Sequence, residues 1–287
     1  MPPPAARVPV RHLLAIILAQ IFALTVQAWL SRTLLAQGYE KLQAHYLAYL
    51  VVPPLLLLML TPVLSEHRDF LKRLFSPRGL TIRVVLGAVV LGVVARVAWW
   101  AQLFARVSFG ITVGEDPNAI AGPVVAWACP PFPGLLLGVL VMAILVPLVE
   151  ETAHRGLVQS ALSDKGPVAA VLISAMVFAV FHPSSSLAWA FIMGLVLGAQ
   201  FWITRTLWAS LLTHATYNGL VQLDWRCLRG QWNPTPESLP QLVPGVLSIA
   251  ALAVALLLIV ALLRWQRAGA LVAPAPSASP GRSRHAR

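Results

Sequence analysis

Long apolar segments alternate with short polar connections along most of the chain. Eight segments are each apolar enough to cross roughly 30 Å of hydrocarbon as a helix. Their expected bounds are 13–31, 47–64, 82–104, 135–153, 167–182, 186–203, 206–223 and 244–263. The pattern therefore predicts an all-α, polytopic membrane protein with about eight transmembrane helices.

Composition strengthens this prediction and adds an orientation. Of the 287 residues, 58% are hydrophobic and 11% are charged, which no ordinary soluble domain approaches. The net charge of +11 would indicate a nucleic-acid partner in a soluble protein, but here its distribution matters more. With a cytoplasmic N-terminus, fifteen basic residues lie inside, five lie outside, and Arg96 lies within the third span. The positive-inside rule then places both termini in the cytoplasm. We expect a multi-pass protein of the cell (plasma) membrane. We expect membrane lipids around it and no nucleic acid.

The chain divides into four parts by composition. Residues 1–130 form N-terminal transmembrane scaffold helices, 134–223 hold nearly all polar residues at membrane depth, 244–263 form a final transmembrane helix, and 268–287 form a disordered basic tail. The first span follows basic residues, so a secretory signal peptide is the alternative to an uncleaved helix, and the length of the apolar stretch favours the helix. Cys129 and Cys227 fall in outer connections, where a disulfide is possible but not required.

Five of the polar residues in predicted spans lie close together in the chain's second half, and an ionisable group in a span costs a few kcal/mol and usually faces a cavity or a partner. They are Glu150, Glu151, His182, His214 and Asn218. At 1.5 Å rise per residue, Glu150 and His182 lie at the same depth, and His214 and Asn218 lie somewhat closer to the cytoplasm. Taken singly, each has an ordinary packing explanation. Together, at comparable depth, they indicate a functional cavity between the fourth, fifth and seventh helices.

Helix spacing separates the two adjacent carboxylates. Glu151 and Arg155 are spaced i,i+4 with the acid first, the favourable order for an ion pair. Glu150 and His154 share the same spacing on a face about 100° away. Because Arg155 neutralises Glu151, Glu150 is the candidate for chemistry.

Three short motifs resemble one known family. "EETAHRG" from Glu150 matches an EExxxR signature, "FAVFH" ending at His182 matches FxxxH, and "HATYN" from His214 matches HxxxN. In this order they are similar to the CPBP intramembrane proteases, the family of type II CAAX prenyl endopeptidases and of bacteriocin-processing and immunity proteins. The resemblance covers 134–223, where the spacing of Gly194 and Gly198 also suits close helix contact.

The resemblance implies an endopeptidase that hydrolyses a peptide bond near the cytoplasmic membrane face. By this resemblance Glu150 activates the attacking water, and His214 and Asn218 donate hydrogen bonds to the oxyanion. His182 positions the water or binds a metal. Glu151 and Arg155 support the shape of the site.

Metal dependence stays open at this stage. The family is often described as metalloproteases, and Glu150, His182 and His214 are ligand types that Zn²⁺ accepts. The sequence lacks an HExxH motif, so the alternative is a glutamate general base that acts without a metal. His154 stands where relatives commonly carry an aromatic residue; it either packs as that ring does, adds a metal ligand, or tunes Glu150. Arg96 either pairs with a site carboxylate or reaches toward neighbouring tryptophans.

Two other classes of function compete with a protease. A non-catalytic immunity or scaffold protein of the same family would keep the fold, although retention of the motif residues argues against it. A proton-coupled transporter also uses intramembrane Glu and His, but it predicts two related halves, whereas these polar residues crowd into one region. The expected substrate is a peptide or another membrane protein, and nothing in the sequence selects prenylated CAAX proteins over others.

Overall fold

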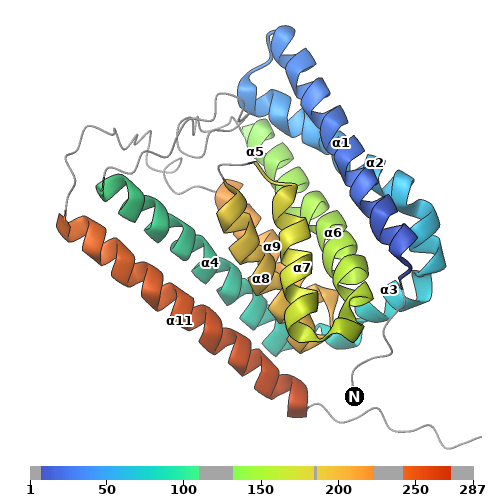
Figure 1. Cartoon of the computed structure of the whole chain (residues 1–287). Coiled ribbons are helices and arrows are strands. Elements are labelled where there is room, and N and C mark those ends of the chain that lie inside the picture. Colours follow the sequence, from blue (N-terminus) through green and yellow to red (C-terminus); the bar gives the residue numbers. More distant parts are fainter. Residues whose placement is uncertain (1–7, 110–131, 184–185, 223–241, 273–287) are drawn as a thin grey trace, which may run out of the picture.

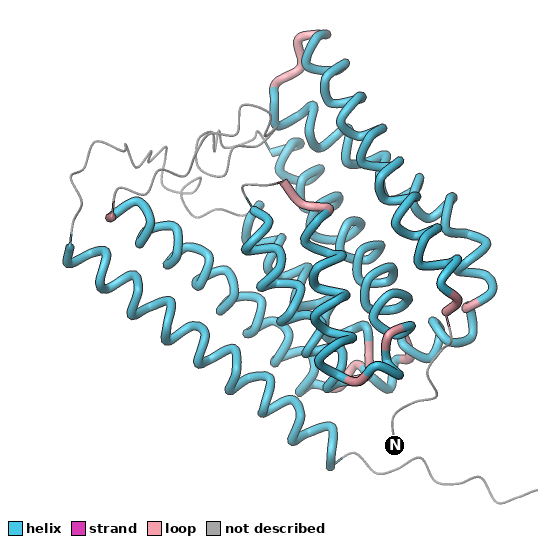
Figure 2. Tube along the Cα trace, in the orientation of Figure 1, coloured by secondary structure: helices cyan, strands magenta, loops and turns pink. Residues whose placement is uncertain are grey.

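The computed structural model describes residues 8–109, 132–183, 186–222 and 242–272, and these residues form helices joined by short loops, without a strand (Figure 2). The all-α prediction is confirmed. The α-helices are α1 (Val10–Ala36), α2 (Lys41–Glu66), α3 (Arg68–Leu74), α4 (Ile82–Ser108), α5 (Phe132–Gly138), α6 (Val146–Glu151), α7 (Pro167–Val180), α8 (Leu187–Thr204), α9 (Leu207–Gln222) and α11 (Leu242–Val272). The π-helical segment η2 (Val139–Leu145) joins α5 to α6, and a second one, η3 (Thr152–Gln159), continues α6, so that residues 132–159 form one longer helix.

The number of membrane crossings differs from the expected eight. All eight apolar segments are helical, but among the described residues six helices have the length and hydropathy to cross a membrane. The exceptions are α7, with 14 residues, and α9, with 16 residues. At 1.5 Å per residue they reach about 21 Å and about 24 Å, short of the roughly 30 Å hydrocarbon layer. Eight crossings are therefore not confirmed, although a multi-pass membrane protein is.

The helices that carry the candidate residues lie in the middle of the molecule. In Figure 1, α4 and α11 run together on one side, α1 and α2 form a pair on the other, and α6 to α9 lie between them. Large apolar side chains such as Leu58, Ile82 and Leu257 are 70 to 72% exposed on the outer helices. That surface suits lipid tails, since soluble monomers rarely expose broad apolar areas.

A close helix contact fixes α8 beside α7. A Cβ atom added to Gly194 would lie 2.9 Å from the Cα of Ala175 on α7, a distance that real Cβ atoms do not reach. At Gly198 it would lie 3.0 Å from Oε1 of Gln159, whose side-chain amide donates to the Gly198 carbonyl at 2.8 Å. The small residues therefore let α8 approach both α7 and η3, as their spacing predicted.

The last helix is longer than predicted. The expected disordered tail began at residue 268, but α11 continues to Val272. Alanine and leucine in "AGALV" (268–272) are good helix formers, which explains why the helix outlasts its apolar span. The remainder of the tail, Cys129 and Cys227 lie outside the described residues.

Candidate active site

The candidate carboxylates lie on an α-helical turn between two π-helical segments. Glu150 and Glu151 end α6, η2 precedes α6, and η3 follows it directly. A π-helical segment hydrogen-bonds i to i+5 and so rotates the side chains that follow it, and such segments are frequent at functional sites. Sequence spacing alone, which assumes a regular α-helix, does not reveal this irregularity.

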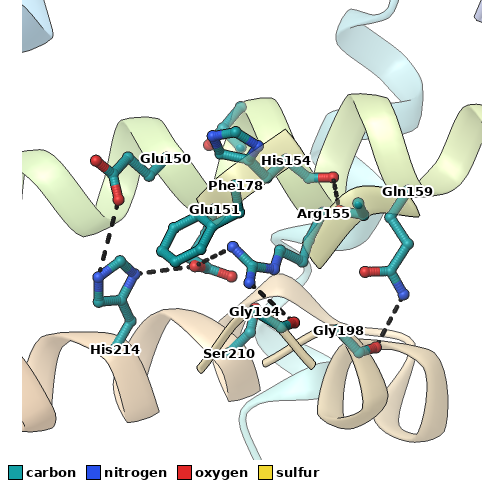
Figure 3. A network of polar contacts seen from close by, with 12 residues as sticks. Glu150, Glu151, His154, Arg155, Gln159, Phe178, Gly194, Gly198, Ser210 and His214 are labelled. Carbon is teal, nitrogen blue, oxygen red and sulfur yellow. Dashed lines mark hydrogen bonds and ion pairs between the residues drawn. The ribbon is translucent and has the colours of Figure 1, made fainter. Parts of the chain in front are cut away.

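Glu151 and Arg155 form the predicted ion pair at the centre of the protein. Arg155 Nη1 donates to Glu151 Oε1 at 3.0 Å, and both side chains are completely buried. Arg155 Nη2 also donates to the Gly194 carbonyl at 3.2 Å, and the guanidinium carbon lies 4.5 Å from the centre of the Phe178 ring. Figure 3 shows these groups on the side of the helix that faces α8 and α9. The pair thus ties three helices together.

Glu151 also holds His214, a contact that helix spacing did not predict. His214 on α9 places Nδ1 2.9 Å from Glu151 Oε1, and its other ring nitrogen, Nε2, lies 3.9 Å from Glu150 Oε2 (Figure 3). A carboxylate bound to one imidazole nitrogen fixes the ring orientation and directs the other nitrogen. Glu151 therefore orients His214 toward Glu150, in addition to pairing with Arg155.

Glu150 borders a cavity of about 50 Å³. That volume holds several water molecules, since one needs roughly 10–15 Å³ measured in this way. Glu150 Oε2 is buried and accepts no hydrogen bond from the described residues. The wall consists of Gln20, Leu24, Tyr49, Val52, Pro53, Leu56, Val146, Val149, Glu150, His154, Phe181, His182 and Pro183. A buried acceptor beside space for water is an arrangement in which a carboxylate can take a proton from water.

His182 reaches this cavity from the end of α7. Its Nδ1 lies 2.9 Å from the Phe178 carbonyl oxygen, to which it donates, so Nε2 is left for another partner. The ring also packs 4.5 Å from the Phe178 ring, measured between centres. Glu150 lines the same cavity, so the structure brings these two predicted site residues together.

Asn218 and His154 make contacts that sequence spacing did not indicate. Asn218 Nδ2 donates to the Met142 carbonyl in η2 at 2.8 Å, and neither Asn218 nor His214 is among the cavity-lining residues. His154 hydrogen-bonds Gln20 of α1 at 2.8 Å and meets the Phe178 ring edge-on with centres 5.2 Å apart. His154 thus packs against an aromatic ring and also connects the central helix to α1.

The cavity takes its far wall from the N-terminal helices, and none of its lining residues comes from α9, so of the three predicted spans expected to enclose it only the fourth and fifth line it. Gln20 of α1 and Tyr49 of α2 both line it, together with apolar residues of those helices. Neither residue was predicted from the sequence to belong to the site. The available signal was weak: Gln20 is a lone amide in "LLAIILAQIFAL" (13–24), and Tyr49 looks like an ordinary interfacial aromatic.

Arg96 packs against neighbouring tryptophans on α4. It is 5% exposed on α4, and its guanidinium carbon lies 4.4 Å and 4.9 Å from the ring centres of Trp99 and Trp100. Of the two expectations for this residue, the structure matches the one in which it stacks on the neighbouring tryptophans.

The three metal-ligand candidates agree with zinc by residue type but not by position. His182 and His214 each have Nδ1 engaged and Nε2 directed elsewhere, as metal-binding histidines usually do. Among the described residues, however, the group whose three ligand atoms lie within 4.8 Å of one another is His12, Glu66 and His67, and Glu150, His182 and His214 do not form such a group. The mechanism below is therefore written without a metal, and metal dependence stays a prediction.

Comparison with known proteins identifies the central region. Residues 132–220 match the family model described as type II CAAX prenyl endopeptidase Rce1-like. The matched region begins at α5, ends within α9 and contains all three sequence motifs. Neither the curated proteins nor the solved structures contain a match to the chain. The match to this region confirms the family inferred from the motifs. Because it is a protease family, the match supports peptidase activity.

Proposed function

We propose that the protein is an intramembrane endopeptidase in which Glu150 is the general base for an attacking water. The observation that carries this proposal is the difference between the surroundings of the two adjacent carboxylates. Glu151 is fully buried and bound by Arg155 and His214, whereas Glu150 has a buried oxygen without a hydrogen bond beside a water-sized cavity. A carboxylate oxygen without a hydrogen bond, on a residue that borders a space able to hold water, suits base catalysis.

His214 donates through both ring nitrogens in this proposal. Nδ1–H donates to the Glu151 carboxylate, whose Oε1 accepts at 2.9 Å, and Nε2–H donates to the oxygen of a substrate carbonyl.

The proposed reaction needs no group beyond water and these side chains. Glu150 takes a proton from water while the water oxygen bonds to the peptide carbonyl carbon, and the carbonyl π electrons move onto oxygen. His214 Nε2–H stabilises that oxyanion. The tetrahedral intermediate then collapses, the C–N bond breaks, and Glu150 returns its proton to the departing nitrogen. The products are a carboxylic acid and an amine.

His182 and Asn218 have supporting roles in this scheme. His182 shares the cavity with Glu150, and its Nε2 positions the water. Asn218 uses one N–H bond to hold α9 against η2 through the Met142 carbonyl. Its amide has a second N–H bond, which we assign to the oxyanion together with His214.

The proposed substrate is a peptide segment or a membrane protein entering from the cytoplasmic side. Glu150 lies nine residues before the end of η3 at Gln159 but 18 residues after the start of α5 at Phe132. At 1.5 Å per residue these separations are about 14 Å and about 27 Å. The shorter one leads to the basic side of the chain, which we take as cytoplasmic along with both termini. Leu24, Val52 and Leu56 give the cavity an apolar wall suited to an apolar substrate segment.

A proteolysis assay in liposomes tests the proposal. The parent, Glu150→Ala and His214→Ala are incubated with prenylated CAAX peptides, unprenylated peptides and membrane-anchored leader peptides, each with and without a chelator. We expect the parent to cleave at least one substrate, and the chelator to leave its rate unchanged. The cleavage rate should fall by about 10²- to 10⁴-fold in both variants. Asp164→Asn, which removes an exposed carboxylate in the turn before α7, is the matched control and should cleave as the parent does.

Equal cleavage by the parent and Glu150→Ala contradicts the mechanism. Complete loss of activity with chelator, restored by Zn²⁺, contradicts the metal-free version. A folded parent that cleaves none of the substrates but protects cells against a bacteriocin supports the immunity alternative instead.

A further inference from the structure

A second group of metal-ligand side chains lies at one end of the first three helices. α1 begins at Val10, α2 ends at Glu66, and the chain turns at His67 directly into α3. Because α1 packs along α2, His12 of α1 meets the last residue of α2 and the residue that follows it. His12 is 8% exposed, and His67 is half-buried.

Three ligand atoms in this group lie close enough together for one small metal ion. One atom from each residue can be chosen so that all three lie within 4.8 Å of one another. The two shortest contacts use different nitrogens of His12: Nδ1 lies 3.2 Å from His67 Nε2, and Nε2 lies 3.3 Å from Glu66 Oε2. Because one ion binds only one of these nitrogens, the Glu66 side chain must rotate before the ligand atoms reach the spacing of roughly 3.3 Å that a tetrahedral Zn²⁺ with bonds of about 2.0–2.1 Å requires.

One contact in this group conflicts with another. His12 Nε2 faces the Arg11 Nε–H donor at 3.4 Å and the Glu66 carboxylate at 3.3 Å. Arg11 requires a lone pair on that nitrogen, whereas Glu66 requires a proton on it, so no single protonation state of His12 serves both contacts. Once Arg11 turns away, Nε2 can either donate to Glu66 or give its lone pair to a cation.

Two exposed side chains allow such a cation to enter. The Arg11 side chain is 74% exposed and contacts Glu66 Oε1 only at 3.9 Å, so it can turn into solvent. The Glu66 side chain is 51% exposed and can rotate toward whichever ligand position is open. Exposed ion pairs of this kind contribute little stability, so displacing Arg11 has a small cost.

We propose that His12, Glu66 and His67 form a binding site for Zn²⁺, with water as the fourth ligand. Imidazole nitrogens and a carboxylate oxygen are ligands that suit Zn²⁺. Mg²⁺ and Ca²⁺ prefer oxygen ligands alone, so the two histidines argue against binding of either ion. The bound ion joins the start of α1 to the end of α2 and the start of α3. Since α1 carries Gln20, which hydrogen-bonds His154 and lines the cavity, the ion also fixes a helix that forms the wall of the proposed active site.

Zinc binding to the full chain, without a polyhistidine tag and in detergent, tests this proposal. The protein is stripped with chelator, titrated with Zn²⁺, and measured for metal content and thermal unfolding. We expect one zinc per chain and a midpoint that rises with zinc concentration, because the ion binds the folded state. His67→Ala should lose both effects, and Glu66→Gln should weaken binding by roughly tenfold or more.

The controls separate this site from the cavity. His182→Ala and His214→Ala should bind zinc as the parent does, since neither residue belongs to the group. Should His12→Ala or His67→Ala fail to fold, the exposed Glu66→Gln still decides the outcome. No zinc bound by the parent, unchanged affinity in Glu66→Gln and His67→Ala, or loss of binding in His214→Ala would each overturn the proposal.

Discussion

Removing the charge of Glu151 should destabilise the protein far more than removing an exposed carboxylate. Glu151→Gln keeps the size of the side chain but leaves Arg155 charged, completely buried and without its carboxylate at 3.0 Å. It also weakens the contact from His214 Nδ1 at 2.9 Å. Arg155 keeps the Gly194 carbonyl and the Phe178 ring, neither of which neutralises a charge.

The expected loss follows from measured buried pairs. Breaking such a pair by removing one partner costs about 3–5 kcal/mol, which for a chain of this size lowers the unfolding midpoint by roughly 6 to 20 °C. Thermal unfolding in detergent micelles, followed by loss of helical circular dichroism, measures this change. The double variant Glu151→Gln with Arg155→Met should recover much of the loss, because the unpaired charge is gone.

Asp69→Asn is the matched control for this experiment. Asp69 and Lys72 form an ion pair at 4.0 Å whose side chains are 90% and 60% exposed, so its loss should leave the midpoint unchanged. The reasoning is refuted if Glu151→Gln and Asp69→Asn unfold at the same temperature. It is equally refuted if the double variant is less stable than Glu151→Gln.

Two further variants test the packing around the site. Gly194→Ala should lower the unfolding midpoint, since its Cβ would lie 2.9 Å from the Ala175 backbone and overpacking costs about 1–3 kcal/mol. Gly219→Ala is the control, because its Cβ would lie 3.7 Å from the nearest side chain. This variant should unfold at or above the parental midpoint. His154→Phe should retain the aromatic packing but leave Gln20 without its buried partner at 2.8 Å, so that adding Gln20→Leu restores stability. Equal midpoints for the two glycine variants, or a double variant no more stable than His154→Phe, would show that these contacts do not act as described.

The central ion pair and the close helix contact were predictable because each depends on local sequence spacing. Glu151 and Arg155 lie one turn apart, and Gly194 and Gly198 leave room for any helix that packs against them. The contact between His214 and Glu151 was not predictable in this way. Its partners are 63 positions apart, and α9 must first pack beside α6 before the ring reaches the carboxylate.

The N-terminal contribution to the cavity escaped prediction for a related reason. Gln20 and Tyr49 stand in segments that are apolar on almost every side. The sequence therefore does not indicate which face of α1 or α2 points into the helix bundle. In lipid, apolar side chains are favourable both inside the bundle and on its lipid-facing surface. The spacing of apolar residues therefore does not show which face of a helix points into the bundle. The π-helical segments beside Glu150 likewise carry no sequence signature. The end of α7 does carry one, because Pro183 follows the helix closely in "FHPSSS" (181–186).

The separation of two adjacent carboxylates into a reacting and a structural group is the central claim. Parallel measurement of kcat and the unfolding midpoint for Glu150→Gln tests it most directly. Since Glu150 meets His214 only at 3.9 Å and borders the cavity, the account predicts a parental midpoint with kcat lowered by about 10²-fold or more. A Glu150→Gln protein that cleaves at the parental rate, or that loses activity only because it unfolds, would contradict the account.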